Sequence, residues 1–342
     1  MSESGPGGAE RARSGTARGQ VRGLSLIGIG VAAVCLAWVF HDVDVRAVVS
    51  RSQAIHWGWV GVAVLLDVAG YVAQGWRWSL LLPRGRRPGI RRATQAIYAG
   101  LFVNELLPVR PGELLRAYLV RRWTGAAIGT VLASILVERL IDGAWLAVAV
   151  ALLAILVPLP RYLVNADEIL AIVVLLGAGC LAVLLWRGRR SAAEAAPAGR
   201  WRQWLASLKL QLDAAGIGPI GAAFAISPLV PLLEALALWS MMRAYALPVT
   251  IGVGVAVMLI IRLGTAVPTA PGNLGTYQFL CVVGLTLFGV DKAAATGFSV
   301  VAFVLLTAPL LAIGFVAFGA SGLTLRRLPA DLDASLDAGR SP

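Results

Sequence analysis

Ionisable side chains stand inside otherwise apolar segments of this sequence, and their spacing limits the chemistry they can do. Glu138 and Asp142 are four residues apart, so a helix places both carboxylates on one face, whereas Arg139 points about 100° away from Glu138. Two carboxylates on one face can bind a cation, carry a proton or accept arginines. The simplest arrangement is an ion-pair network that holds the segments in place, with one of three arginines as partner: Arg110, Arg116 or Arg262.

Further charges lie at the depth of a membrane. Asp67 is about ten residues into its apolar segment, roughly 15 Å deep if that segment is a helix. Glu234 follows the kink-prone Pro228 and Pro231. Because an ionised side chain at the middle of a bilayer costs about 2.5–3.5 kcal/mol, we expect these residues to line a polar cavity. The other members of the set surround a break in the chain: Glu105, Arg110, Glu113 and Arg116.

Arg77 stands between Trp76 and Trp78, near the end of its apolar segment. Two interpretations fit this position. The guanidinium can snorkel toward the headgroups beside interfacial tryptophans. Alternatively, it can contact a lipid headgroup at the mouth of a cavity.

The segments that carry these charges are those of an integral membrane protein. The chain has 342 residues, 58% hydrophobic and 14% charged, with a mean hydropathy of +0.78, whereas soluble domains carry about 25% charge. A membrane-spanning helix needs roughly 20 apolar residues. We predict an all-α integral membrane bundle with about six full spans, at residues 24–40, 57–82, 126–158, 168–187, 217–247 and 293–320.

Two other apolar segments are interrupted and predict re-entrant helical hairpins. Residues 93–107 and 113–122 flank a break at 108–112, and arginines at both outer ends place both ends in the cytoplasm. Residues 251–267 and 273–288 flank a break at 268–272. This second hairpin has no such arginine clusters at its ends, so we expect it to enter from the periplasm. Non-helical backbone at membrane depth must be buried in protein or line a wet cavity. We therefore expect the two breaks to meet inside the bundle.

The two breaks share a pattern, because Pro111-Gly112 and Pro271-Gly272 each follow another proline by three residues. With Glu113 and Asn273 next in line, this pattern predicts an inverted repeat with halves at about 57–158 and 217–320. Two ordinary loops that happen to share proline and glycine are the alternative. In a repeat, the helix after each break would direct free N–H groups into the cavity, which favours an anion.

The net charge of +12 is distributed as short basic runs beside apolar segments. This is the positive-inside pattern of membrane proteins, and we expect no nucleic-acid partner. The predicted organisation is a disordered basic cytoplasmic tail (1–23), a single transmembrane domain (24–322) and a second cytoplasmic tail (323–342). Both termini then face the cytoplasm of a bacterial inner (plasma) membrane.

Four stretches of the chain resemble the lysylphosphatidylglycerol synthase transmembrane family, also called the flippase-like family. They are Arg77 with the leucines at 80–82, and residues 104–116, 137–142 and 267–277. The resemblance implies a membrane module for lipid translocation or for lipid and lipid-linked glycan assembly. In the best-known members it flips an aminoacylated phospholipid made by a fused soluble domain. This chain ends about twenty residues after its last predicted span, so we expect no aminoacyl transfer. Gln278 stands where relatives often carry an acidic residue.

We therefore expect a lipid flippase-like protein that takes an anionic headgroup, without cofactor, metal or catalytic residue. Lipid-biosynthesis enzymes are its possible partners. The alternatives are a membrane transferase or a non-catalytic partner in lipid, polyprenyl-glycan or hopanoid biosynthesis. For a transferase, the candidate metal motifs are the Asp-x-Asp triplets at 42–44 and 331–333, and the remaining candidate is the pair Glu138 and Asp142, which lies too deep for a nucleotide-sugar. The candidate substrate-binding residues are Arg77, Arg110, Gly112, Glu113, Arg116, Glu138, Arg139, Asp142, Arg262, Pro271, Gly272 and Asn273.

Overall fold

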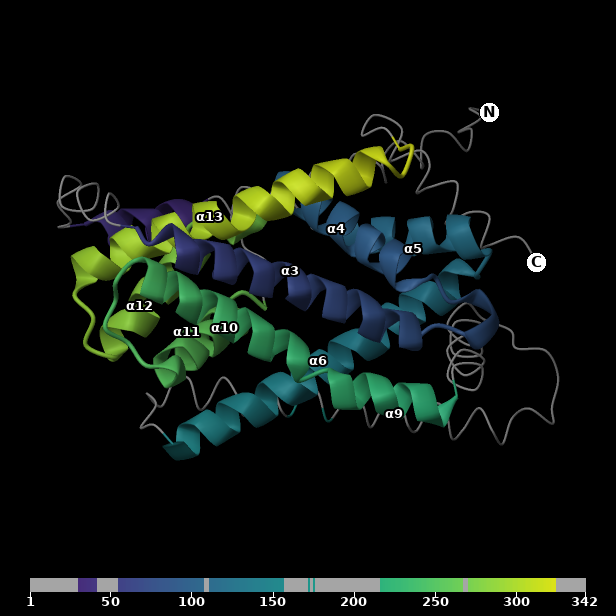
Figure 1. Ribbon diagram of the computed structural model, residues 1–342, viewed down its shortest axis with the longest axis horizontal. Helices are drawn as coiled ribbons and strands as arrows, with labels where there is room; N and C mark the ends of the chain where they lie inside the picture. Colours follow the sequence, from purple (N-terminus) through teal and green to yellow (C-terminus); the bar gives the residue numbers. More distant parts are fainter. Residues whose placement is uncertain are drawn as a thin grey trace, which may run out of the picture.

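The computed structural model describes residues 30–41, 55–107, 111–156, 172, 175, 216–266 and 270–323, and all regular structure within them is helical. The elements are α3 (Trp57–Leu80), η1 (Arg84–Arg86), α4 (Ile90–Leu106), α5 (Gly112–Thr124), α6 (Ile128–Leu156), α9 (Ile217–Ile226), α10 (Leu229–Ala244), α11 (Ile251–Gly264), η3 (Pro271–Asn273), α12 (Thr276–Leu287) and α13 (Lys292–Gly319). Figure 1 shows the long helices α3 and α13 extending along the length of the molecule, with α10 beside part of α3.

Several helices have the length and composition of membrane spans. Among the described residues, Trp57–Leu80, Gly218–Ala244 and Lys292–Gly319 are long and apolar enough to cross a bilayer. Gly30–Phe40, Ile251–Gly264 and Thr276–Leu287 are shorter apolar helices. The prediction of an all-α membrane protein is therefore confirmed. The predicted tail at 1–23 and most of the predicted span at 168–187 and tail at 323–342 lie outside the described residues.

The predicted span 217–247 is interrupted, with α9 ending at Ile226 and α10 starting at Leu229. Proline has no backbone N–H, so Pro228 cannot bond the carbonyl of Phe224 four residues earlier. The indole Nε1 of Trp145 on α6 donates to that carbonyl at 3.1 Å. The same carbonyl also accepts from the Ser227 N–H at 3.3 Å, so the break leaves it one acceptor position, which ties α6 to the junction of α9 and α10.

A pair of helices flanks each predicted break, with small shifts in the bounds. In the first, α4 and α5 pack together where a Cβ on Gly112 would overlap the carbonyl of Gly100, so the two helices approach at backbone distance. The side chain of Asn104 accepts a hydrogen bond of 2.7 Å from the Gly112 N–H. In the second, α11 ends at Gly264, η3 occupies the break, and α12 begins at Thr276, three residues later than predicted.

Helices α3 and α10 lie side by side and antiparallel along their length (Figure 1). At one end the His56 N–H donates to the Ala244 carbonyl at 3.0 Å. Further along, the rings of Trp59 and Trp239 meet edge to face with centroids 5.6 Å apart. At the other end Arg77 donates to a hydroxyl next to the α9–α10 break. This pair forms the spine against which the two hairpins pack.

Arginines gather at one end of the bundle, here called the basic end. There Arg86 hydrogen-bonds the carbonyl of Gly125 after α5. Arg122 donates to the Ser321 carbonyl after α13 at 3.3 Å. The start of α9 is close by, since a Cβ on Gly216 would lie 3.5 Å from Nη2 of Arg84. The opposite end contains the starts of α3, α11 and α13 and the end of α10.

The end of α4 reaches the second break. Helix α4 contacts η3, and a Cβ on Gly272 would overlap the carboxylate of Glu105. Gly272 has φ 61° and Asn273 has φ 53°, so the backbone of η3 turns through the left-handed region beside this carboxylate. The end of α4 thus contacts η3 at the second break.

Candidate functional site

A cluster of paired charges is buried between α3, α5 and α6. Arg77 is 1% exposed and Glu138 is fully buried. Nη2 of Arg77 lies 3.0 Å from Oε1 of Glu138, and Nη1 pairs with Asp142. The same Nη1 donates to the Ser227 hydroxyl at 3.3 Å, and Gln74 donates to Glu138 at 3.0 Å. The i,i+4 carboxylates of α6 therefore accept an arginine of α3, and the snorkelling interpretation of Arg77 is wrong.

A second arginine completes the coordination of Glu138. Nη2 of Arg116 on α5 lies 2.9 Å from Oε2 of this carboxylate. Its guanidinium also stands over the ring of Trp78, with Cζ 4.3 Å from the centroid. Trp78 in turn donates through Nε1 to the Ser134 hydroxyl at 3.0 Å. The expected ion-pair network with Arg116 is confirmed, and it fastens the first hairpin to α3 and α6.

The network ends in a more exposed pair. Arg139 lies 3.0 Å from a carboxylate oxygen of Glu113 and 3.7 Å from Asp142. The side chains of Arg139 and Glu113 are 47% and 46% exposed, so their pair contributes little to stability. Three arginines and three carboxylates balance within this cluster, hereafter the α6 cluster: Arg77, Arg116, Arg139, Glu113, Glu138 and Asp142.

Arg262 pairs elsewhere. Its Nε donates to Oε2 of Glu234 at 2.6 Å, and its Nη2 pairs with the other oxygen of the same carboxylate. This bidentate pair joins α11 to α10 and is partly exposed, at 30% for the arginine and 25% for the glutamate. The sequence had offered Arg262 as a partner for Glu138 or Asp142, and that pairing is wrong.

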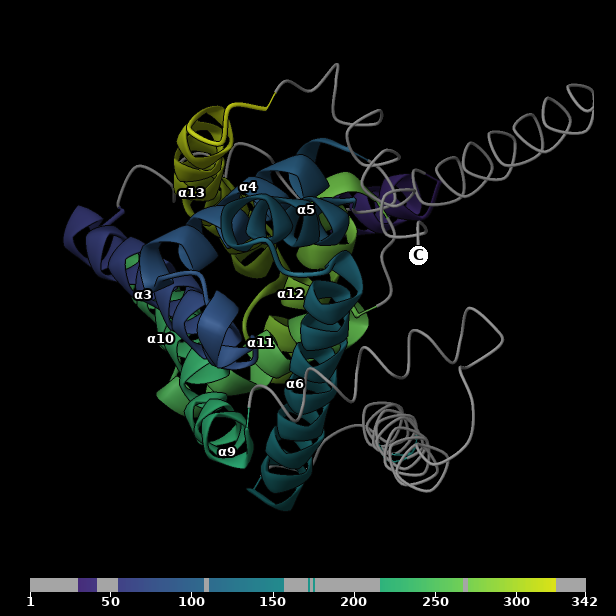
Figure 2. The ribbon, with the colours of Figure 1, turned by 90° about the vertical axis from the view of Figure 1, so that its right-hand side faces the viewer.

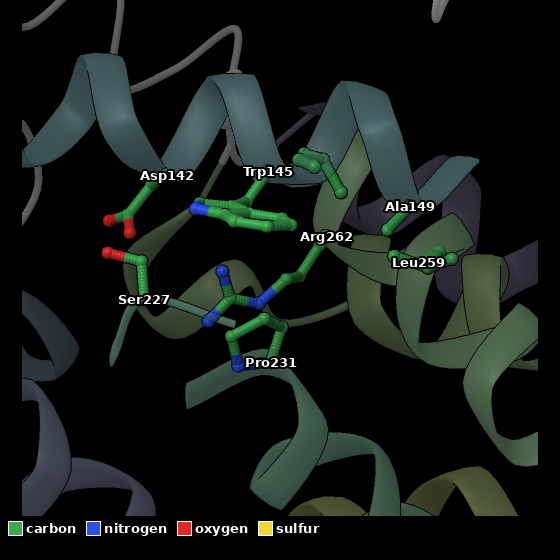
Figure 3. A pocket seen from close by; sticks show the side chains of 8 residues that line it. Asp142, Trp145, Ala149, Ser227, Pro231, Leu259 and Arg262 are labelled. Atoms are coloured by element: carbon green, nitrogen blue, oxygen red, sulfur yellow. The ribbon is translucent and has the colours of Figure 1, made fainter. Parts of the chain in front are cut away.

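A narrow pocket lies between the two charge clusters. Its walls come from α6, the α9–α10 junction and α11, and its free space admits about one water molecule. Figure 2 shows α6 on one side of the bundle and α9 and α10 on the other, with α11 between them. In Figure 3 the oxygens of Asp142 and Ser227 lie close together, and the Trp145 ring lies over Arg262. The lining residues are Asp142, Trp145, Leu146, Ala149, Ser227, Pro231, Leu259 and Arg262.

The pocket thus contains two of the predicted site residues, Asp142 and Arg262, while the residues of the breaks that the structure describes do not line it. The N–H groups at the helix starts, which were predicted to favour an anion, are partly used in hydrogen bonds within the protein. The Gly112 N–H donates to Asn104, and the Gly275 N–H, just before α12, donates to Gln278 at 2.7 Å. Gln278 therefore caps its own helix. Arg110 lies outside the described residues, as does the side chain of Pro271.

Sequence reasoning missed the neutral members of the site. Gln74 sits three residues before Arg77, so a helix places both on one face, and this spacing was an available signal. Ser227 and Trp145 had no such signal. The role of Trp145 depends on the carbonyl freed by Pro228 on another helix, and that of Ser227 on the antiparallel packing of α3 and α10.

Several helices are long enough to span a bilayer, and ionisable side chains pair with one another inside the bundle. These features define a polytopic membrane protein with a polar interior. The chain belongs to the family described as the lysylphosphatidylglycerol synthase TM region, whose profile matches residues 25–314. This match confirms the resemblance seen in the sequence. A comparison with curated proteins gave no significant match.

Proposed function

We propose that this protein moves an anionic phospholipid headgroup through the membrane, by way of the pocket between α6 and α10–α11. The observation that carries the proposal is Arg262, a cation on the wall of a pocket inside a membrane bundle. Arg262 lies about ten residues, or roughly 15 Å, from the start of α11, which is near the middle of a bilayer about 30 Å thick. The family is named after the membrane region of an enzyme of lipid modification, which supports a lipid as substrate.

The proposed scaffold is an inverted repeat of α3–α6 and α10–α13, corresponding to halves at about 57–158 and 217–320, with α4–α5 and α11–α12 as re-entrant hairpins. Two observations support it. The elements that would correspond, α3 and α10, are antiparallel. The contacts between the halves also correspond. The first helix of each hairpin packs on the last helix of the other half, α4 on α13 and α11 on α6. The pocket then lies between one half's last helix and the other half's first hairpin.

The proposed orientation places the basic end in the cytoplasm of a bacterial inner (plasma) membrane. Arginines at the ends of α3 and α5 converge on this end, as the positive-inside rule requires. Both termini are then cytoplasmic, with about six full spans in total. Under this orientation the first hairpin enters from the cytoplasm and the second from the periplasm.

In the proposed mechanism the Nε and Nη2 groups of Arg262, which hold Glu234 in the described state, donate instead to the phosphate of the headgroup. Glu234 holds the guanidinium when the pocket is empty, so the lipid must displace this carboxylate. Because the pocket admits about one water molecule, α6 must separate from α10 and α11 to admit a headgroup. The α6 cluster keeps α5 and α6 attached to α3 during this opening. The proposed mechanism has no covalent step, so we propose that the protein is a transporter and not an enzyme.

The proposal is tested with the purified full-length protein in vesicles that contain a fluorescent phosphatidylglycerol in both leaflets. A membrane-impermeant quencher removes the outer-leaflet signal at once, and further loss reports lipid movement. We expect this second phase to be faster than in protein-free vesicles, and faster for phosphatidylglycerol than for phosphatidylcholine. A rate equal to that of protein-free vesicles would contradict the proposal. Full activity only after addition of a co-purified enzyme would favour the alternative of a partner subunit.

A further inference from the structure

The middle of the bundle contains more carboxylates than arginines. Asp67 on α3 and Glu234 on α10 interact electrostatically across the spine, and the pair has one arginine, Arg262, which is bound to Glu234. Among the described residues, Asp67 has no ion-pair or hydrogen-bond partner. Asp67, Glu234 and Arg262 each lie about ten residues from the helix end that is farthest from the basic end. All three are therefore at one depth, near mid-membrane.

Three tyrosines interact electrostatically with the same carboxylate, and two of them have buried hydroxyls without a hydrogen-bond partner among the described residues. Tyr98 is 3% exposed, its hydroxyl has no hydrogen-bond partner in the described part of the chain, and it interacts electrostatically with Asp67. The Tyr277 hydroxyl is likewise buried without a partner and interacts with Asp67. Tyr71 is four residues after Asp67 on α3, so the two side chains share a helix face, and its ring lies 5.2 Å from that of Tyr98. Burying a hydroxyl without a hydrogen-bond partner is costly. These phenols can therefore donate to an acceptor beside Asp67, or accept a hydrogen bond from its protonated carboxyl.

We propose that Asp67 and Glu234 form a proton-binding pair that takes up a proton when an anionic headgroup displaces Glu234 from Arg262. An ionised carboxylate without a partner is expensive at this depth, so Asp67 is protonated in the described state. Once the headgroup takes Arg262, Glu234 loses its only cation and binds a proton from water. The anionic headgroup and one proton then cross together, and the step carries no net charge.

A proton fits this site better than a metal ion. Within the described residues, no three acidic, histidine or cysteine side chains are grouped as a metal site requires. The titratable groups that interact electrostatically with Asp67 are Tyr71, Tyr98, Glu234 and Tyr277; Glu105 acts on Tyr71, and Arg262 is bound to Glu234. Helix α9 contains no titratable residue, α13 has only Lys292 at its far start, and the acids of α6 are paired with arginines. The inference rests on the proposed function in one respect, that the displacing anion is a lipid headgroup.

Infrared spectroscopy of the full-length protein in lipid nanodiscs tests the pair without any transport. At neutral pH we expect the carbonyl band of a buried protonated carboxyl, lost in Asp67→Asn. Replacing phosphatidylcholine discs by phosphatidylglycerol discs should strengthen the band in the wild type and leave it unchanged in Glu234→Gln. The matched control is Asp291→Asn, since Asp291 is an exposed cap of α13 and asparagine caps equally well; it should keep both signals.

Absence of the band from the wild type, or its persistence in Asp67→Asn, would overturn the inference. So would equal bands in the two kinds of disc. The wild-type spectra decide the question even if Asp67→Asn does not fold. If these signals appear but vesicles show no lipid movement, the proton site stands and the transport proposal fails. If lipid moves and the band is absent, the proton inference alone fails.

Discussion

Replacing Glu138 with alanine is expected to lower the free energy of unfolding by about 3–5 kcal/mol, because it breaks buried ion pairs. This carboxylate is fully buried and accepts from Arg77, Arg116 and Gln74. Its loss leaves Arg116 without an ion pair and Arg77 with only Asp142, in a medium where an uncompensated charge is costly. The measurement is thermal unfolding of the purified protein in detergent, together with the amount that accumulates in the membrane.

The matched control for this prediction is Arg139→Ala, on the adjacent position of α6. That guanidinium is 47% exposed and its partner Glu113 is similarly exposed, so the change should cost less than about 1 kcal/mol. Glu138→Gln should fall between the two, because the amide oxygen still accepts a hydrogen bond but carries no charge. A Glu138→Ala protein that melts at the wild-type temperature would show that the α6 cluster does not hold the bundle together.

Arg262→Gln and Glu234→Gln are expected to change lipid binding in opposite directions. Arg262→Gln removes the cation of the pocket and should weaken retention of phosphatidylglycerol about tenfold or more, since a charged hydrogen bond contributes about 1.5–3 kcal/mol. Glu234→Gln removes the carboxylate that competes for the guanidinium, so the headgroup should bind more tightly than in the wild type. The measurement is the ratio of phosphatidylglycerol to phosphatidylcholine retained by the purified protein, by native mass spectrometry.

This pair of variants separates a binding role from a structural one. If the bidentate pair only joined α10 to α11, both variants would lose stability and lipid together. The control is Arg243→Gln, which removes an exposed arginine at the opposite end of the bundle and should leave the ratio unchanged. A parallel decrease in both pocket variants would contradict the assignment of Arg262.

The helix breaks could be predicted from the sequence because their signals are local. A proline-glycine break between short apolar arms ends a helix wherever the chain lies, and both breaks appear within a few residues of the expected places. The meeting of α4 with η3 also followed from a physical rule, that irregular backbone at membrane depth must be covered by protein.

The pairing of the charges could not be predicted, because it depends on how each helix is rotated. Arg77 and Glu138 are 61 residues apart in sequence, and only the packing of α3 beside α6 brings them to 3.0 Å. Position along a span gives depth but not the face that a side chain occupies. Arg77 therefore resembled a snorkelling residue at a helix end, although it points into the bundle. For the same reason Arg262 was matched with α6 rather than with Glu234.

Entry of a lipid headgroup into the pocket is tested with a phospholipid that carries a maleimide on its headgroup. Single cysteines are placed at Ala149 and Val148 in protein whose native cysteines are replaced by alanine. Both positions are at one depth on α6, but Ala149 lines the pocket and Val148 is 46% exposed on the outer face. We predict a covalent adduct at position 149 and little at 148. Equal labelling of the two positions, or none at 149, would contradict the account.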